Sequence, residues 1–429
     1  MKAYPEYKSS GIEWLGEIPS HWEKCAFKYF LTQISEVSTS NNKVGLENIE
    51  SGTGQFNATD SLFEGNGIDF KKGDILYGKL RPYLRKVWIA EFDGNAVGDF
   101  FVYRVQKNAT EKYVKWLFLS NGFTEIANSS TDGAKMPRVS SDFIRNLEYY
   151  LPPLCEQTAI AAYLDEQTTK IDALIAEKQT QVENLRAYRT SLITDTVTHG
   201  LNPDAPLRHS GIDWLGDIPQ HWEMSALKYL TSKIGSGITP RGGSEVYLDK
   251  GVLFIRSQNV YPDGLHLDDP KYISESIDES MSNTRVYTGD ILLNITGASI
   301  GRCCVYTMTE SANVNQHVCI IRPLCNLIKN QFLSYVLNSK IGQDQIALFQ
   351  TGGNREGLNF EQLKNFAIPL PPRSEQQAIA EFLDDKTEKI DALIDELNKQ
   401  LDELAEYRQA VISEAVTGKV DVRDYRPQN

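Results

Sequence analysis

Two long stretches of the chain repeat apolar side chains with a helical period and contain no glycine or proline. In residues 155–199, a heptad frame with Leu164 at position a gives the predicted interface residues Leu164, Ile171, Leu174, Leu185 and Leu192. In residues 374–417, the same frame gives Leu383, Ile390, Leu393, Leu397, Leu404 and Val411. Further apolar residues at position e widen both stripes. This pattern, sustained over several heptads, predicts two long helices that pack as a coiled coil.

The residues that flank each stretch fit helix ends. Proline pairs at 152–153 and 371–372 precede the helices and disfavour helical backbone before them. Gly200 and Gly418 follow, where a left-handed residue can close a helix. Each helix of about 45 residues would be ~65 Å long at 1.5 Å per residue. Because both copies lie on one chain, we expect them to pair antiparallel with each other; homodimerisation through the helices is the alternative.

These helices belong to a sequence repeat. The repeated segments, here called the frame, are the helices and a short segment that precedes each variable block. Residues 10–23, SGIEWLGEIPSHWE, match residues 210–223, SGIDWLGDIPQHWE, at 11 of 14 positions. Residues 151–200 match residues 370–419 at 25 of 50 positions. The blocks between them, 24–150 and 224–369, share little. The chain is therefore expected to hold two similar modules that recognise different things.

The two unlike blocks are long enough for each to bury its own core. They contain short strand-like segments joined by turns, as in Gly73-Asp-Ile-Leu-Tyr-Gly78 and Gly289-Asp-Ile-Leu-Leu-Asn294. We predict an α+β fold with a pseudo-two-fold internal repeat, in which a long antiparallel two-helix coiled coil separates two globular domains of mixed helix and strand. The expected boundaries are 1–150 and 201–369 for these domains, 151–200 for the central helix, and 370–429 for the C-terminal helix and tail.

The formal net charge of −13 argues at first against binding to nucleic acid. Most of that charge lies on the predicted helices: residues 155–199 hold 7 acidic and 4 basic side chains, and residues 374–417 hold 12 acidic and 4 basic. Residues 24–150 hold 16 basic and 15 acidic side chains, and residues 224–369 hold 13 of each. The two blocks are therefore near neutral and can present basic faces.

Each block contains side chains suited to contact with phosphates or base edges. In the first block these are Lys79, Arg81, Tyr83, Arg85, Lys86, Lys135 and Arg138. In the second block they are Thr239, Arg241, Arg256, Asn259, Arg302, Asn315, Gln316, Asn354 and Arg355. The alternatives are a solvated strand edge in the first block and ordinary turn chemistry in the second. The loop at 235–243 is rich in glycine but lacks the GxxxxGK[ST] spacing of a P-loop.

Other classes of site have weak support. The six cysteines include no CxxC pair and the histidines form no HExxH pattern, so we expect no metal site and reduced, mostly buried thiols. No apolar run approaches the ~20 residues of a membrane span, and the N-terminus lacks a signal-peptide core, which predicts a cytoplasmic protein. The repeated tryptophans at 14, 22, 214 and 222 favour scaffold packing over a nucleotide clamp.

The repeated segments together resemble the specificity subunit of Type I restriction–modification systems, over nearly the whole chain. The resemblance lies in residues 10–23 and 210–223, in the LPPxxEQ opening of each long helix, and in segments such as Gly78-Lys-Leu-Arg-Pro-Tyr-Leu-Arg-Lys86 and Gly297-Ala-Ser-Ile-Gly301. The family implies that each block is a target recognition domain reading one half of a split double-stranded DNA sequence. It implies that the paired helices set the gap between the halves and dock partner subunits.

The resemblance also implies which components this chain lacks. The partners would be two methyltransferase subunits and two restriction subunits that act as motor and nuclease. S-adenosylmethionine, ATP and Mg²⁺ would belong to those partners, and this chain would hold no cofactor and no catalytic residue. A self-contained restriction or methylation enzyme is the first alternative, but we find no [ND]PP[YF] motif for base methylation. A coiled-coil adaptor that never contacts DNA is the second.

Overall fold

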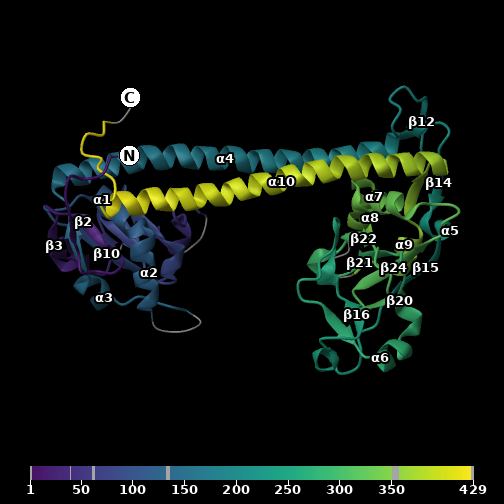
Figure 1. The fold of residues 1–429 in the computed structure, drawn as a ribbon, viewed down its shortest axis with the longest axis horizontal. Helices are drawn as coiled ribbons and strands as arrows, with labels where there is room; N and C mark the ends of the chain where they lie inside the picture. Colours follow the sequence, from purple (N-terminus) through teal and green to yellow (C-terminus); the bar gives the residue numbers. More distant parts are fainter. Residues whose placement is uncertain (1, 39, 60–62, 132–135, 350–356, 427–429) are drawn as a thin grey trace. The chain divides into compact units, whose positions relative to one another are not determined.

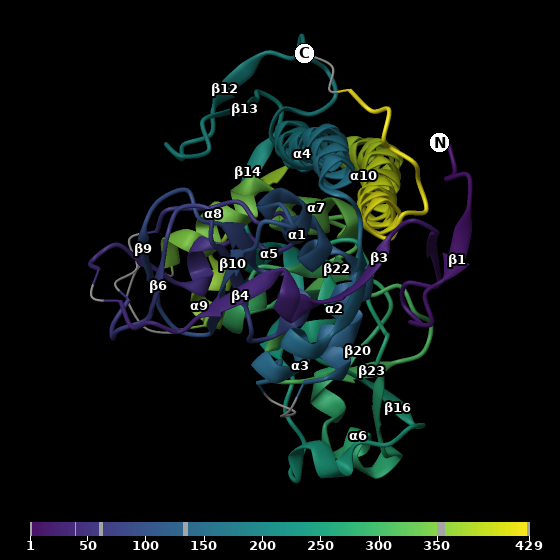
Figure 2. The ribbon, with the colours of Figure 1, turned by 90° about the vertical axis from the view of Figure 1, so that its left-hand side faces the viewer.

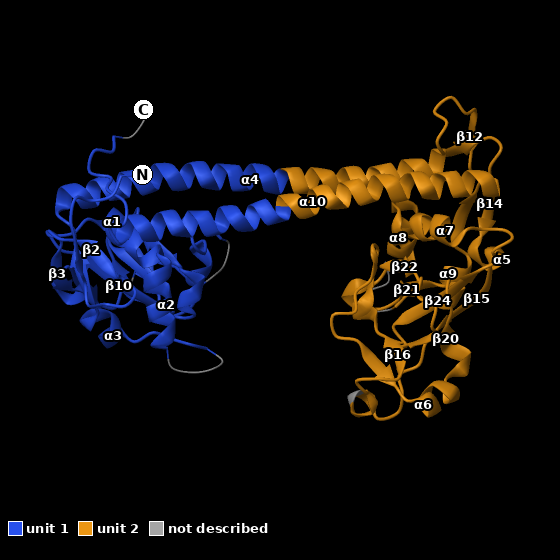
Figure 3. Cartoon of the chain, in the orientation of Figure 1, with its two compact units in different colours: residues 1–180, 398–429 blue, residues 181–397 orange. Residues whose placement is uncertain are grey.

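The two halves of the chain form two units that share a plan. The computed structural model describes residues 2–38, 40–59, 63–131, 136–349 and 357–426. Unit 1 comprises residues 1–180 and 398–429, and unit 2 comprises residues 181–397 (Figure 3). Two long helices, α4 (Leu154–His199) and α10 (Arg373–Val416), each contribute to both units (Figure 1). Both predicted helices are thereby confirmed.

Unit 1 is built of short strands around three helices. Its strands are β1 (Tyr7–Ser9), β2 (Glu17–Pro19), β3 (Glu23–Ala26), β4 (Leu31–Ile34), β5 (Lys43–Val44), β6 (Ile68–Phe70), β7 (Ile75–Gly78), β8 (Val87–Ile89), β9 (Gly94–Ala96), β10 (Phe100–Val105) and β11 (Glu148–Leu151). Its helices are α1 (Glu111–Leu119), α2 (Asn121–Ser129) and α3 (Ser141–Asn146), with 3-10 turns η1 (Phe27–Tyr29), η2 (Leu46–Asn48) and η3 (Pro82–Leu84).

Unit 2 repeats this order with additions. Its strands are β12 (Leu207–His209), β13 (Asp217–Pro219), β14 (Glu223–Ala226), β15 (Thr231–Ser236), β16 (Val252–Ile255), β17 (Val260–Tyr261), β18 (Gly264–Leu265), β19 (Lys271–Ile273), β20 (Arg285–Val286), β21 (Ile291–Asn294), β22 (Cys303–Val305), β23 (Ala312–Val314), β24 (Val318–Pro323) and β25 (Ala367–Leu370). Its helices are α5 (Leu227–Leu230), α6 (Glu275–Ser280), α7 (Asn330–Asn338), α8 (Lys340–Phe349) and α9 (Phe360–Lys364), with 3-10 turns η4 (Gly243–Val246), η5 (Ser257–Asn259), η6 (Ser282–Thr284) and η7 (Gly297–Ser299).

The first sheets of the two units correspond strand for strand, and the second sheet of unit 2 has the additional strand β19. A four-stranded antiparallel sheet has the order β4-β10-β7-β8 in unit 1 and β15-β24-β21-β22 in unit 2. A second sheet is β5-β9-β6 in unit 1 and β19-β16-β23-β20 in unit 2, and each contains one parallel pair. The hydrophobic cores of both units extend onto the long helices, so the helices are part of each unit's fold.

A buried ion pair supports the first sheet in each unit. The Asp74 carboxylate accepts two bonds from Arg104, at 2.8 and 2.7 Å, and one from a backbone N–H. In unit 2 the Asp290 carboxylate accepts two bonds from Arg322, both at 2.7 Å, and again one from a backbone N–H. Each carboxylate is almost fully buried and each is fully bonded, as a charge removed from water requires.

Within each unit the two long helices run antiparallel, as predicted, and they lie side by side in Figure 2. In unit 1 Arg408 donates to both carboxylate oxygens of Asp172, at 2.7 and 3.2 Å. In unit 2 Arg189 donates to both oxygens of Asp391, at 2.9 and 3.0 Å. A shift of 219 residues converts one pair into the other, so the same contact occurs twice.

Part of the predicted heptad frame is wrong. The d residues Leu174 and Leu393 are 47% and 55% exposed, whereas the other nine predicted interface residues are buried or half-buried. The seam runs through positions a and e, where the e residues Val182, Ile394 and Arg408 are buried. Positions a and e alternate by four and three residues just as d and a do, so either choice satisfies the heptad pattern. The heptad pattern did not indicate position e in place of d as part of the interface, because several residues at e are arginine or threonine.

The repeated tryptophan segments pack against the ends and beginnings of the long helices. Gly418 ends α10 with a φ of +70°, and a Cβ there would lie 2.4 Å from Pro19 and 3.0 Å from Trp22. Gly200 ends α4 with a φ of +77°, and a Cβ there would lie 3.1 Å from Trp222. Both glycines are left-handed, as expected of residues that close a helix.

The LPPxxEQ segments brace the same regions. The buried Gln157 amide accepts from Thr110 N at 2.8 Å and donates to the Pro152 carbonyl at 2.9 Å. Gln376 makes the same two kinds of bond in unit 2, both at matching distances. The glutamates that precede these residues bond His21 and His221. Trp22 and Trp222 are also fully buried, which supports scaffold packing for these two tryptophans, whereas Trp214 is 41% exposed.

Candidate nucleic-acid interface

In unit 1, the predicted contact residues cluster on the loop that joins β7 to β8. Arg138 donates two hydrogen bonds to the Asp99 carboxylate, at 3.1 and 2.9 Å, and the Lys79 ammonium forms an ion pair with it at 3.8 Å. Backbone bonds hold these residues together, because Lys79 N donates to the Asp99 carbonyl and its own carbonyl accepts from Val139. The structure therefore brings two separate sequence segments, 79–86 and 136–138, to one surface.

Two other basic residues of this loop are engaged inside unit 1. The Lys86 ammonium donates to the carbonyls of Leu46 and Ile49 at 2.7 and 2.8 Å. The Arg85 guanidinium donates to Asn121 Oδ1 at 2.5 Å. Burial lowers the pKa of both side chains. These residues brace the loop, a structural role that the spacing of basic residues did not reveal.

Arg81 and Tyr83 are the residues of this loop that face solvent. Arg81 is exposed and Tyr83 is 51% exposed. The Arg81 backbone N–H donates to the Pro137 carbonyl at 2.8 Å. Its guanidinium makes no hydrogen bond or ion pair with any residue that the structure describes. The cation and the aromatic ring are therefore available to a ligand.

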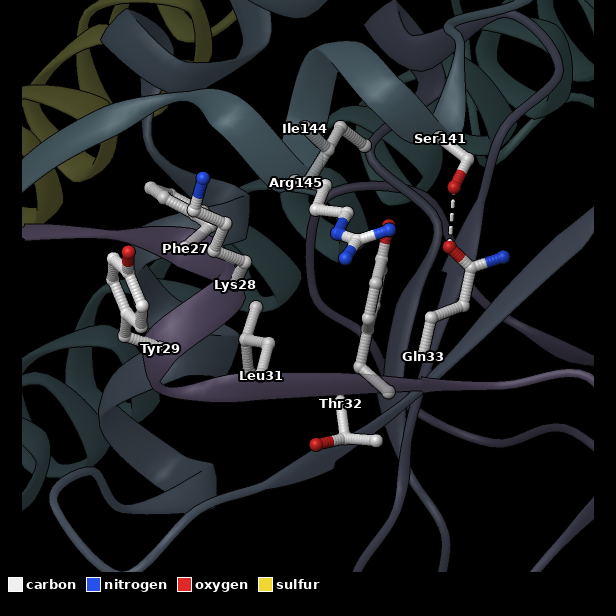
Figure 4. Close-up of a pocket in the computed structure, with 10 residues that line it drawn as sticks. Phe27, Lys28, Tyr29, Leu31, Thr32, Gln33, Ser141, Ile144 and Arg145 are labelled. Atoms are coloured by element: carbon white, nitrogen blue, oxygen red, sulfur yellow. Dashed lines mark hydrogen bonds between the residues drawn. The ribbon is translucent and has the colours of Figure 1, made fainter.

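A pocket of about 420 Å³ opens elsewhere on unit 1, around η1, β4 and α3 (Figure 4). Ser141 donates a hydrogen bond to Gln33 across the pocket. The Arg145 side chain lies next to Ile144 in the pocket lining (Figure 4). At its rim, Lys28 lies 5.4 Å from the Tyr29 ring centroid and donates to Asn146 at 3.4 Å. Unit 2 repeats this rim, since Lys228 lies 5.1 Å from the Tyr229 ring and donates to Asn365 at 3.0 Å. The rim therefore belongs to the shared frame.

In unit 2 a pocket of about 790 Å³ lies beside the loop from β21 to β22. The Arg302 guanidinium lies 4.7 Å from the centroid of the Tyr261 ring, whose other neighbour is the His266 ring at 4.1 Å with an interplanar angle of 13°. Stacking of this kind holds a guanidinium flat and leaves its N–H donors free in the plane. Among the described residues, Arg302 has no other side-chain partner.

Neutral hydrogen-bonding groups complete the lining of this pocket. His317 Nδ1 lies 2.6 Å from Thr296 Oγ1, and its Nε2 lies 3.2 Å from the Gln316 amide nitrogen. If the amide donates, His317 is neutral and donates from Nδ1 to the threonine. Gln258 adds an exposed amide. Arg302 is the one arginine or lysine among the described lining residues, so the pocket suits a base edge better than a phosphate.

The remaining predicted residues, all of unit 2 except Lys135, fall into three groups. Three of them form hydrogen bonds within the fold. Arg256 donates to the Asp269 carbonyl at 2.8 Å. The buried Asn259 links the backbones of Arg256 and His266, and the buried Asn315 accepts from His317 N. Arg241 and Gln316 are exposed and Thr239 is half-buried. Lys135, Asn354 and Arg355 lie outside the described residues, and their predicted contacts stay predictions.

Sequence reasoning missed Gln258, Tyr261 and Thr296 as members of the unit 2 pocket. Tyr261 gives no signal in the sequence, because its role depends on a stack with His266 and Arg302 from other segments. Thr296 directly precedes the segment Gly297-Ala-Ser-Ile-Gly301, and a single threonine there forms no pattern that would indicate a site. The signal that was available is the correspondence of Gly73-Asp-Ile-Leu with Gly289-Asp-Ile-Leu, which locates the same loop in both units.

Other kinds of site have little material in the structure. Across the described ranges, no group of three or more His, Cys, Asp and Glu side chains could hold a metal ion. Cys303, Cys304 and Cys319 are buried, and burial raises the pKa of the Cys304 and Cys319 thiols to about 12. Cys155 and Cys325 are exposed. None of the helices that could be searched has the length and apolar character needed to cross a membrane.

Comparisons with known proteins agree with this division into two units. A family model described as the Type I restriction modification DNA specificity domain matches twice, at residues 23–184 and 219–403. The Type I restriction enzyme EcoBI specificity subunit of Escherichia coli is 25% identical over 365 residues, which cover 83% of this chain and 75% of that protein. The putative MjaX specificity subunit of Methanocaldococcus jannaschii is 25% identical over 442 residues, covering 95% and 96%.

Two solved structures share the fold. A chain from a study of complex assembly and conformational transition of the type I R-M system superposes with a TM-score of 0.75 at 19% identity, covering 94% of this chain and 99% of that one. The HsdS subunit from Thermoanaerobacter tengcongensis gives a TM-score of 0.51 at 20% identity, covering 94% and 98%.

Proposed function

Since this chain belongs to the family of Type I restriction–modification DNA specificity domains, we propose that it is the non-catalytic subunit that selects the DNA sequence. Each unit would read one half of a bipartite double-stranded target. The observation that carries this proposal is the contrast between a repeated frame and two different loop surfaces, Arg81 with Tyr83 in unit 1 and the Arg302 pocket in unit 2. Two readers on one chain raise affinity by effective concentration.

We further propose the partners that the family implies. Two methyltransferase subunits and two restriction subunits would dock on this chain, and S-adenosylmethionine, ATP and Mg²⁺ would be bound by those subunits. The complex would work in the cytoplasm, where its DNA is accessible. A chain that supplies no catalytic group must act through partners, so the free chain should neither methylate nor cut DNA.

The paired helices would set the number of base pairs between the two half-sites. Support comes from the fact that each unit's core extends onto both helices, which leaves no flexible linker between unit and helix. A helical connection of this kind holds a spacing better than a random coil. Half-sites read from one face of a duplex are favoured near one helical turn, ~34 Å.

Methylome sequencing of cells that carry this chain with its methyltransferase partner tests the main proposal. We expect one bipartite motif with two fixed halves and a fixed gap. Protection of random sequences by the co-purified complex, or methylation without a split motif, would contradict the proposal.

A matched deletion tests the spacing. Removing one heptad from each helix, residues 178–184 and 396–402, keeps the Asp172–Arg408 and Arg189–Asp391 pairs on either side of the deletion. The connection becomes about 10 Å shorter with only ~20° of rotation. The methylated motif should keep both halves and lose roughly three base pairs of gap at 3.4 Å each. An unchanged gap would refute the spacing role.

A further inference from the structure

The loop from β7 to β8 contains two arginines with left-handed backbone. Arg81 has φ 50° and ψ 66°, and Arg85 has φ 49° and ψ 48°. They are the two non-glycine residues with positive φ among those that the structure describes. Left-handed backbone brings the Cβ of an L-residue close to its own peptide oxygen and costs free energy. Such residues persist where something else requires them.

Unit 2 shows that the loop itself does not require arginine. The strand pairs Tyr77–Val87 and Leu293–Cys303 enclose loops of nine residues in both units. Two backbone hydrogen bonds also correspond. In unit 1, Gly78 N donates to the Lys86 carbonyl and Leu84 N to the Arg81 carbonyl. In unit 2, Asn294 N donates to the Arg302 carbonyl and Ile300 N to the Gly297 carbonyl. Arg81 and Arg85 therefore correspond to Gly297 and Gly301, whose φ values are 75° and 87°. Glycine makes this backbone without strain.

The two arginines differ in what their side chains do. Arg85 is half-buried and its guanidinium bonds Asn121 on α2, so its side chain stabilises the packing of the loop on the helix. Arg81 is exposed, and its guanidinium has no bond to any described residue. Pro82 follows it and adds to the restriction on its backbone. The side-chain bond of Arg85 gives its strain an internal reason, whereas the described residues give none for the strain at Arg81.

We propose that Arg81 is a phosphate anchor, through which unit 1 holds the DNA backbone without regard to sequence. This rests on the function proposed above. Lys79 and Arg138 share the single carboxylate of Asp99, so Asp99 balances only one of their two positive charges. A base-reading arginine needs its planar fork held in place, as Tyr261 holds Arg302 in unit 2. No ring holds Arg81 among the described residues, and an exposed guanidinium without such a support suits a phosphate.

The test uses the full chain co-purified with its methyltransferase partner, with R81G, R81A and R85G as variants. R81G and R81A both lack the guanidinium and should weaken binding equally, several-fold to about tenfold, on duplexes with and without the target motif. The dependence of log affinity on log salt should become shallower by about 0.9, the value of one phosphate contact. R81G should melt at or above the temperature of the parent, and above R81A, because glycine relieves the strain.

R85G is the matched control, since it also places glycine at a left-handed position. It should melt below R81G, because the lost bond to Asn121 offsets the same relief of strain. Unchanged binding by R81G, or a changed motif in the first half-site at an unchanged salt slope, overturns the anchor while the proposed function stands. A parent complex that binds no DNA refutes the proposed function and the anchor together.

Discussion

The two units differ least in their backbone and most in the side chains that the backbone presents. The nine-residue loops 78–86 and 294–302 share two backbone hydrogen bonds and have left-handed backbone at the same two positions, yet one loop carries arginines there and the other glycines. The first sheet of each unit is held by an ion pair with a buried carboxylate, Asp74 with Arg104 and Asp290 with Arg322. Because contacts within the sheet hold each unit together, the residues at the tips of its loops can vary without loss of the fold. This division explains how one fold can carry two different recognition surfaces.

If the buried ion pairs hold the frame, breaking either one should have the largest effect on stability. Arg104→Leu and Arg322→Leu each leave a buried carboxylate with only backbone donors. We expect a loss of about 3 kcal/mol in the free energy of unfolding, at the lower end for a broken buried pair because each arginine is partly exposed. Hydrogen exchange would locate the loss in unit 1 or in unit 2. A loss below about 1 kcal/mol in either unit would show that the two frames are not held alike.

The two interhelical ion pairs are related by the repeat but are not equivalent. Arg408 is buried, donates also to the Gly52 carbonyl at 3.1 Å and lies 6.0 Å from the Trp116 ring, whereas Arg189 bonds Asp391 and no other described residue. Arg408→Ala should therefore cost about 2 kcal/mol and Arg189→Ala about 1 kcal/mol. Denaturant titration of both variants measures the difference. Equal losses would mean that the extra contacts of Arg408 carry no weight.

The buried tryptophans distinguish the units more finely. Trp22 Nε1 donates to Glu156 at 3.0 Å, and the Nε1 of Trp222 has no partner among the described residues. Trp22→Phe loses a bond to a charged acceptor and Trp222→Phe loses none, so the first should cost about 1–2 kcal/mol more than the second. Thermal melts of the two variants, read by hydrogen exchange in each unit, measure this. A larger loss for Trp222→Phe would reverse the assignment.

Much of the frame could be predicted from the sequence. The repeat located both long helices and their glycine ends, because helical period and chain-end chemistry are local properties. The seam was harder: Leu174 and Leu393 look like interface residues, and Arg408 does not, yet the arginine is buried because Asp172 from the other helix bonds it. A pairing across 236 residues leaves no local signal.

The candidate site was predictable as a region and not residue by residue. The cluster of basic residues at 79–86 located the unit 1 loop, but only three-dimensional structure separates Arg85 and Lys86, which brace the loop, from Arg81, which faces solvent. In unit 2, Tyr261 acquires its role from its contacts with the nearby His266 and with Arg302, which lies far along the chain. Side-chain function of this kind depends on tertiary contacts that residue type does not encode.

The smallest expected effect belongs to a surface that both units share. Tyr29 and Tyr229 are each 65% exposed, and each lies beside a lysine that bonds an asparagine, so the repeat has kept a feature that the core does not use. Tyr29→Ala and Tyr229→Ala should each change the free energy of unfolding by less than about 0.5 kcal/mol, as for exposed residues in general. Denaturant titration measures both. A loss above 1 kcal/mol in the free energy of unfolding would show that these exposed tyrosines stabilise the fold. They would then belong with the structural contacts of the frame and not with the variable surface.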